Sequence, residues 1–295
     1  MRIGFCLPQF GVPAAVPGAV TRFAREAEAL GADSLWVGDR LLAPVTPEVG
    51  DARTSSMPVQ FRAPMDPFTV LAAAAAVTTR PLLGTSVLNA PYYPPPVLAR
   101  SLTTLDVLSG GRLITGLGIG WSPEEFRAVG VPMKQRGARL DECLDILDAL
   151  WTKNPAEYHG RHFDIDKAHA DLKPVQQPGP PVYLGGYSPA ALDRAARRAD
   201  GWLPTAVVPG FDPARIAAGA ARVREGAAAA GRPEPGLILR VNPAARATVA
   251  DIAATIATAA DAFGVGHAYV DLMYLADGTD AAIGLAGQIL DAVRP

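Results

Sequence analysis

The chain has 295 residues, of which 49% are apolar and 19% are charged, so it is long and apolar enough to bury a large core. The net charge of −2 gives no sign of the strongly basic character that nucleic-acid and membrane-surface binding require. Two cysteines, Cys6 and Cys143, are too few for a disulfide framework, and neither stands in a pattern of metal ligands, so no metal site is expected.

Apolar strands alternate with amphipathic helices along the chain. The expected strands, in chain order, are Arg2–Leu7, Ser34–Val37, Leu82–Leu88, Arg112–Leu117, Pro181–Leu184, Gly201–Pro204, Gly236–Val241 and Ala268–Leu272. The expected helices are Ala19–Leu30, Asp66–Thr79, Val97–Leu108 and Arg136–Trp151, then helices that start at Ser188-Pro189, Asp212-Pro213 and Thr248, and a last one around Asp280–Val293. A capping residue followed by proline, or by an acid three residues later, marks several of these starts.

Eight strands that each precede a helix favour an α/β fold, a (β/α)₈ TIM barrel that spans residues 1–295 as one domain. A doubly wound open sheet is the alternative, because strands read from one sequence can be misplaced. Two segments interrupt the alternation. The proline-rich segment 41–65 follows the second strand and is expected to be a lid on the catalytic face, and residues 152–180 form an insertion in which Tyr158–Ile165 has the pattern of a hairpin.

Glycines end two of the expected strands. Gly116, Gly118 and Gly120 lack the spacing of a dinucleotide fingerprint, so a tight bend explains them equally well. Gly185 and Gly186 stand directly before a helix that Ser188 caps. Free N–H groups and the positive end of a helix can bind a phosphate there, although an ordinary short turn has the same form.

Six groups of residues occur in the order typical of one family. They are Ile3–Pro8, Ser34–Asp39, Leu83–Val87, Ser109–Arg112, Leu117–Trp121, and Pro181–Gly186 with Ala199–Trp202. With them the chain resembles the bacterial-luciferase-like superfamily of flavin and deazaflavin enzymes. Within that superfamily it is most similar to the branch that uses coenzyme F420, a 5-deazaflavin that carries hydride, mainly because of the strand Gly84-Thr85-Ser86-Val87.

The resemblance implies a set of cofactor contacts. In that branch a cis peptide bond, here Ser86–Val87, supports the deazaflavin from behind. Asp39 matches a position that contacts the ring, and the glycine-rich segment at Gly185 matches the phosphate site. The full set of predicted cofactor-binding residues is Asp39, Ser86, Val87, Asn89, Ile119, Gly120, Trp121, Gly185, Gly186 and Ser188.

The chain departs from the family pattern at two positions. The sugar-phosphate dehydrogenases of the family carry a histidine and a glutamate where this chain has Arg40 and Trp121. Because oxidation of a hydroxyl needs a base, we expect a substrate other than a sugar phosphate. No residue is assigned to proton transfer: Arg40, Glu124 and Tyr92, together with Glu125, are candidates, and a structural role is the favoured interpretation for these acids and this tyrosine. Arg40 binds an anionic substrate or pairs with an acid.

These observations predict an oxidoreductase that transfers hydride between C5 of coenzyme F420 and a small organic substrate, held under the segments 41–65 and Tyr92–Pro96. Reduction of an activated C=C or C=N bond is favoured over alcohol oxidation, because the histidine and glutamate are missing. The alternatives are an FMNH₂-dependent monooxygenase, with FMN as cofactor, and a non-catalytic flavin or deazaflavin carrier.

The expected partners are a small-molecule substrate and a second copy of the chain, with neither nucleic acid nor membrane. The homodimer is implied by the resemblance, since a helix similar to Arg136–Trp151 often joins a dimer interface in the family. No signal peptide precedes the first strand, and the alanine-rich run Leu71–Val77 is too short to span a bilayer, so a cytoplasmic protein is expected.

Overall fold

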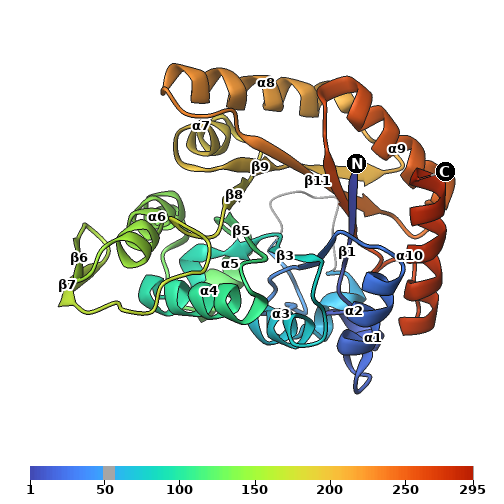
Figure 1. Cartoon of the computed structure of the whole chain (residues 1–295), viewed down its shortest axis with the longest axis horizontal. Coiled ribbons are helices and arrows are strands. Elements are labelled where there is room, and N and C mark those ends of the chain that lie inside the picture. Colours follow the sequence, from blue (N-terminus) through green and yellow to red (C-terminus); the bar gives the residue numbers. More distant parts are fainter. Residues whose placement is uncertain (49–56, 295) are drawn as a thin grey trace.

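The first strand of the sheet pairs with the last one, so the sheet has no free edge. The computed structural model describes residues 1–48 and 57–294, and in it Ile3 lies opposite Ala268 in a parallel ladder. Around the barrel the strands are β1 (Arg2–Cys6), β2 (Ser34–Val37), β3 (Leu82–Thr85), β5 (Leu113–Gly118), β8 (Val182–Gly185), β9 (Gly201–Leu203) with β10 (Thr205–Val208), β11 (Gly236–Pro243) and β12 (His267–Val270). This closed barrel of eight parallel strands confirms the predicted fold and excludes the open sheet (Figure 1).

Two barrel strands are interrupted. β9 and β10 are one strand broken at Pro204, which has no N–H to donate, and both parts pair with β11. β3 ends at Thr85 and resumes as β4 (Leu88–Asn89), which pairs with β5. The Ser86–Val87 bond between them is cis, as predicted. With β10 included, the sixth strand runs to Val208, beyond the expected Gly201–Pro204.

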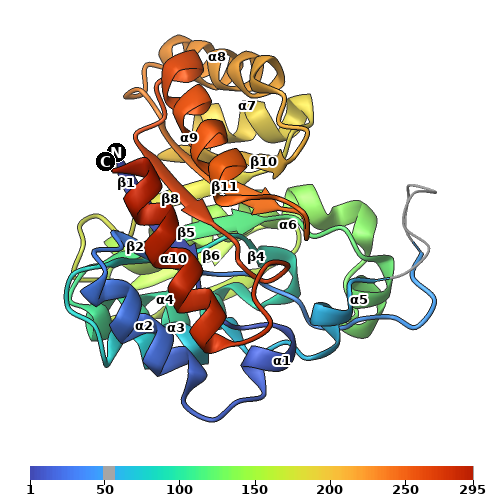
Figure 2. The same ribbon diagram turned by 90° about the vertical axis from the view of Figure 1, so that its right-hand side faces the viewer.

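Helices surround the barrel on its outer face. They are α2 (Ala19–Ala29), α3 (Pro67–Ala75), α4 (Pro95–Ser109), α6 (Arg136–Thr152), α7 (Pro189–Arg198), α8 (Pro213–Ala229), α9 (Val249–Phe263) and α10 (Thr279–Val293). Figure 2 shows α10 between α9 and α2, where it closes the ring of helices over the seam between β12 and β1. In the described part of the chain, none of the helices has the length and apolar character needed to cross a bilayer.

The predicted helix starts are confirmed by their caps. The side chains of Asp66, Ser188, Asp212 and Thr248 each accept a hydrogen bond from the backbone N–H three residues later. Thr248 and Asp251 form the reciprocal capping box. Two short helices were not predicted, α1 (Gly11–Ala14) and α5 (Pro123–Ala128), although Ser122-Pro123 gives α5 the same starting signal.

The insertion between α6 and β8 contains the predicted hairpin. β6 (Ala156–His159) and β7 (Asp164–Ala168) are antiparallel, with Tyr158 opposite Ile165, and they extend beyond α6 (Figure 1). Within the segment 41–65, residues 49–56 lie outside the described part, and the remainder is irregular apart from the 3-10 turn Val59–Arg62. Its role as a lid, and the assignment of residues 1–295 to one domain, stay predictions.

The interior of the barrel is packed and partly polar. Trp36, Ile114, Leu203, Ile238 and Tyr269 fill it, and the Trp36 and Tyr269 rings stack with their centroids 4.2 Å apart. The indole N–H of Trp36 donates to Ser34 Oγ, which also lies 2.7 Å from His267 Nε2. Burial lowers the pKa of His267 to about 4, so this imidazole is neutral at physiological pH. A ligand can therefore enter only above this packing, at one of the two ends of the barrel.

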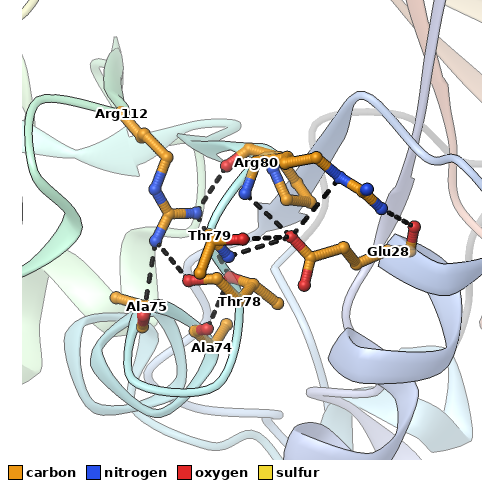
Figure 3. Close-up of polar contacts among 8 residues, drawn as sticks. Glu28, Ala74, Ala75, Thr78, Thr79, Arg80 and Arg112 are labelled. Atoms are coloured by element: carbon orange, nitrogen blue, oxygen red, sulfur yellow. Dashed lines mark hydrogen bonds and ion pairs between the residues drawn. The ribbon is translucent and has the colours of Figure 1, made fainter.

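The amino-terminal end of the barrel is occupied by structural contacts (Figure 3). The guanidinium of Arg112 donates to the carbonyls of Ala75 and Thr78 and to Pro81 O at 2.7 Å, where α3 ends and β3 begins. The Glu28 carboxylate accepts the N–H groups of Thr79 and Arg80 nearby. Free carbonyls at a helix end need such partners. The family-like residues Ser109–Arg112 therefore serve stability at this end of the barrel.

The tight packing between β3 and β5 at Gly116 can be tested by substitution. A Cβ at this position would lie 1.8 Å from the carbonyl oxygen of Thr85, so the two strands would have to separate. We expect Gly116→Ala to lower the free energy of unfolding by at least about 2 kcal/mol in urea titrations. Gly266→Ala is the matched control, because a Cβ there meets no atom within 4 Å, and it should change stability by less than about 0.5 kcal/mol. Equal effects of the two substitutions would contradict this packing.

Candidate active site

The carboxyl ends of the strands bring most of the predicted cofactor residues together. Asp39 follows β2, Ser86 and Val87 follow β3, and Gly185 ends β8. Asn89 in β4 pairs with Gly118 at the end of β5, next to Ile119 and Gly120. Because all eight strands are parallel, these ends meet at one rim, which we call the mouth of the barrel.

Val87 forms the floor of the mouth. A Cβ on Gly118 would lie 2.5 Å from Val87 Cγ2, and a Cβ on Gly185 would lie 3.1 Å from Val87 Cγ1, so the valine fills the space between β5 and β8. Residues 83–86 and 88–90 are buried, whereas Val87 is partly exposed. The floor is therefore a small apolar surface flanked by bare backbone, which suits the face of a flat ring.

Asp39 lies on one wall and is held by the chain after β4. One carboxylate oxygen accepts the backbone N–H of Asn89 at 2.8 Å. Burial raises the pKa of Asp39 to about 6, against the lowering effect of the Asn89 N–H and of a hydrogen bond from Tyr93. This carboxyl group can therefore gain or lose a proton near neutral pH.

Arg40 and Glu125 form a buried ion pair beside it. Arg40 Nη1 lies 3.2 Å from Glu125 Oε2, and the two side chains are 5% and 1% exposed. Glu125 Oε1 accepts the backbone N–H groups of Leu41 and Leu42, and Oε2 accepts the hydroxyl of Tyr92 at 3.0 Å. Glu125 thus fixes the start of the segment 41–65 against α5. Of the two roles open for Arg40, the structure shows the pairing with an acid.

Two aromatic rings cover Arg40. Its guanidinium carbon lies 4.5 Å from the ring centroid of Trp121 and 5.0 Å from that of Phe61. Trp121 is 47% exposed, so its outer face is open at the rim. Arg40 Nε is buried and has no hydrogen-bond partner among the residues that the structure describes.

Glu124 is engaged at the start of α5. Its carboxylate accepts the hydroxyl of Ser122 at 2.7 Å and the backbone N–H of Glu48. Both contacts lie at the start of α5 and on the segment after β2, so the structural interpretation of Glu124 fits this geometry. Tyr92 likewise donates its hydroxyl to Glu125, and burial beside that carboxylate raises the pKa of Tyr92 far above its ordinary value.

The expected phosphate residues lie at the start of α7. Gly186 has a φ of +120°, a backbone conformation that favours glycine, and the Ser188 hydroxyl accepts the N–H of Ala191. A positive charge comes from a helix far along the chain, because the guanidinium of Arg215 in α8 lies 4.7 Å from the ring centroid of Tyr187. With Thr205 and Phe211 these two side chains line a hollow of about 200 Å³ beside α7.

The sequence did not predict several residues that the structure places in the site. Gln9 is 1% exposed and exchanges two hydrogen bonds with the backbone of Gly38, which fixes the chain before Asp39. Arg240 and Asp271 form an ion pair in the mouth. Gln9 stands three residues after the end of β1, close enough to a strand end for the sequence to suggest a role, whereas Arg240 was hidden by its apolar neighbours in the sequence.

Most of the chain matches one known protein family. Residues 1–283 match the model of a family described as luciferase-like monooxygenases. The chain belongs to the luciferase-like family. An uncharacterised protein of Mycobacterium tuberculosis is 37% identical over 220 residues, 72% of either sequence. The phthiodiolone/phenolphthiodiolone dimycocerosates ketoreductase of the same species is 32% identical over 242 residues, which cover 79% of this chain and 62% of that enzyme.

Solved structures share the luciferase-like fold. The monooxygenase RslO1 from Streptomyces bottropensis has a TM-score of 0.82 at 20% identity, with 99% of this chain and 98% of that one covered. An F420-dependent secondary alcohol dehydrogenase in complex with an F420–acetone adduct has a TM-score of 0.77 at 18% identity, and the match covers 100% of this chain and 99% of that one. The FMN-bound oxygenating constituent of 3,6-diketocamphane monooxygenase from Pseudomonas putida has a TM-score of 0.65 at 20% identity, and the match covers 81% of this chain and 66% of that one. The fold and family predictions are confirmed, and luciferase-like proteins are oxidoreductases and monooxygenases.

The ion pair between Arg40 and Glu125 should be important for stability. Glu125→Gln keeps acceptors for the two backbone N–H groups but leaves the buried cation without its counter-charge, which costs about 3–5 kcal/mol in comparable sites. Glu124→Gln is the matched control and should cost less than about 1 kcal/mol. Urea unfolding at pH 7 measures both. The double variant R40M/E125Q should recover part of the loss, and an E125Q cost no larger than that of E124Q would contradict a coupled pair.

Asp39 should make stability depend on pH. Its folded-state pKa of about 6 lies above the ordinary 3.8, so the folded protein holds this proton more tightly than the unfolded chain does. The stabilising contribution is therefore full below about pH 4 and is lost as the pH rises through 6, at most about 3 kcal/mol. The stability of wild type relative to Asp39→Asn should fall between pH 4 and pH 7 in urea titrations. Parallel stability curves for the two proteins would rule out the raised pKa.

Proposed function

We propose that this protein is a coenzyme F420-dependent oxidoreductase that transfers hydride between C5 of the deazaflavin and a small organic substrate. The observation that carries the proposal is the floor of the mouth, where the partly exposed Val87 lies between Gly118 and Gly185. Bare backbone on both sides accommodates the Val87 side chain, whose partly exposed apolar surface would support the face of a tricyclic ring. Asp39 and Asn89 stand at the edge of that floor.

The polar groups around the floor fit such a ring. Asn242 Oδ1 on β11, Arg240 Nε and Arg40 Nε are buried and have no hydrogen-bond partner among the described residues. An unpartnered buried polar atom costs about 1–3 kcal/mol, so a ligand that supplies acceptors and an N–H donor at this edge gains affinity. The pyrimidine part of a deazaflavin or flavin carries both kinds of group.

The chemistry of the mouth points to work by a bound cofactor. When bound, F420 supplies the hydride-carrying carbon, and the protein orients the two reactants and excludes water. Glu125 is committed to Arg40, to Tyr92 and to two backbone N–H groups, so it holds the wall in place. Asp39, with a pKa of about 6, is suited to hold or release the proton that accompanies hydride transfer.

Two observations support F420 and reduction. The strand Gly84-Thr85-Ser86-Val87 resembles that of the F420 branch, and one relative is named as a ketoreductase, an enzyme that reduces a carbonyl. This chain has Arg40 and Trp121 where the sugar-phosphate dehydrogenases carry a histidine and a glutamate, so reduction of an activated C=C or C=N bond is favoured over oxidation of a hydroxyl. The description of the family as monooxygenases favours the alternative, an FMNH₂-dependent monooxygenase.

The first experiment is a titration of the purified protein with oxidised F420 and with FMN, followed by quenching of tryptophan fluorescence. F420 should bind with a micromolar or tighter Kd, and FMN at least about tenfold more weakly. Asn89→Ala should raise the Kd for F420 by about 5- to 20-fold, the equivalent of one lost hydrogen bond in the mouth. Asn154→Ala, in the insertion, is the control and should leave the Kd unchanged.

Other outcomes separate the alternatives. Tighter binding of FMN, with consumption of O₂ by the reduced complex, would identify the monooxygenase. F420 bound without turnover of a panel of enones, imines and ketones would indicate the carrier. Binding of neither cofactor would refute the proposal.

A further inference from the structure

A charged side chain lies inside the barrel at the level of the mouth. Successive side chains of β11 alternate between the two faces of the sheet, so Leu239 and Val241 join the outer core while Ile238 lies in the interior. Arg240 therefore faces inward as well, one step nearer the mouth than Ile238. Asp271 directly follows β12, the neighbouring strand.

Arg240 connects its neighbour to the opposite wall of the barrel. Its Nη2 lies 2.5 Å from Asp271 Oδ2, and Nη1 donates to the carbonyl oxygen of Ser86 at 3.3 Å. Ser86 is the residue before Val87, so the guanidinium lies at the floor of the mouth. Asp271 is also fixed by its own chain, because Oδ1 accepts the N–H of Met273.

The two partners differ in exposure. The Arg240 side chain is 22% exposed and that of Asp271 only 3%. Tyr269 and Trp36 are completely buried beneath them, so the exposed part of Arg240 can face only the mouth. Burial raises the pKa of the neighbouring Cys6 thiol well above its ordinary value, so this thiol adds no charge beside Arg240 and Asp271. The cation is thus presented to a ligand, with its counter-charge behind it.

We propose that Arg240 sets the charge beneath the cofactor ring, and that Asp271 attenuates it. Receipt of a hydride, which is one proton and two electrons, adds one negative charge to an oxidised deazaflavin or flavin ring, and the substrate that gives the hydride becomes one charge more positive. A fixed cation at the floor favours the more negative, reduced state of the ring. This inference rests on the proposed function only in that it needs either cofactor in the mouth.

The test is the midpoint potential of the bound cofactor, measured by equilibration with redox dyes. Arg240→Met removes the cation and exposes Asp271, so the ratio of reduced to oxidised cofactor should fall at least tenfold, about 30 mV for a two-electron couple. Asp271→Asn frees the cation and should raise that ratio by a similar factor. The double variant R240M/D271N should lie near wild type. Opposite signs are the signature of charge, because a merely structural pair would change both single variants in the same direction.

Controls separate this inference from the proposed function. The matched control is the ion pair between Arg194 in α7 and Asp141 in α6, in which Nε and Oδ1 lie 2.6 Å apart. The variants R194M and D141N should leave the midpoint potential unchanged. Arg240→Lys keeps the charge and should shift the ratio less than threefold, which also tests the idea if R240M does not fold. Normal cofactor binding with equal potentials in all variants would overturn the role of Arg240 alone. Binding of neither F420 nor FMN to wild type would overturn the proposed function.

Discussion

All eight strands of the barrel run in the same direction, and this constraint decides where chemistry can take place. Parallel neighbours require a returning helix after each strand, so every loop that leaves a carboxyl end comes out at the same rim. Asp39, Asn89 and Gly185 belong to different units, yet the constraint brings them to one mouth. At the opposite end the same geometry gathers Arg112 and Glu28, whose contacts close off helix and strand ends.

The mouth is built on two layers of charge. The outer layer is the pair of Arg40 and Glu125, which ties α5 to the segment after β2 and carries the exposed ring of Trp121. The inner layer is the pair of Arg240 and Asp271, directly above the stacked Trp36 and Tyr269. Arg240 also contacts the carbonyl oxygen of Ser86, the residue before Val87. Glu125, Asp39 and Asp271 in these walls already accept hydrogen bonds from the backbone, so their positions are fixed.

The sequence predicted the features that depend on neighbouring residues. Capping by Asp66, Ser188 and Thr248 acts over three positions, and the barrel follows from the repeated alternation of strand and helix. Arg240 was not predicted, and Glu125 was a candidate without known partners, because the contacts of both lie far along the chain: Leu41 is 84 positions from Glu125, and Ser86 is 154 positions from Arg240. Periodicity shows which face of a strand is inward, but only the closed barrel shows what stands opposite.

The ladder between β1 and β12 has a consequence for how the chain acquires its shape. β1 is made first, but its partner, His267–Val270, emerges from the ribosome only after all the other strands. Until then the growing sheet has two open edges, and on one of them the N–H and C=O groups of β1 that face β12 are unpaired. Contacts between residues so distant in sequence form slowly. The nascent protein therefore passes through a long interval in which a second unfinished chain, or a chaperone, can compete for the edge that its own last strand will cover.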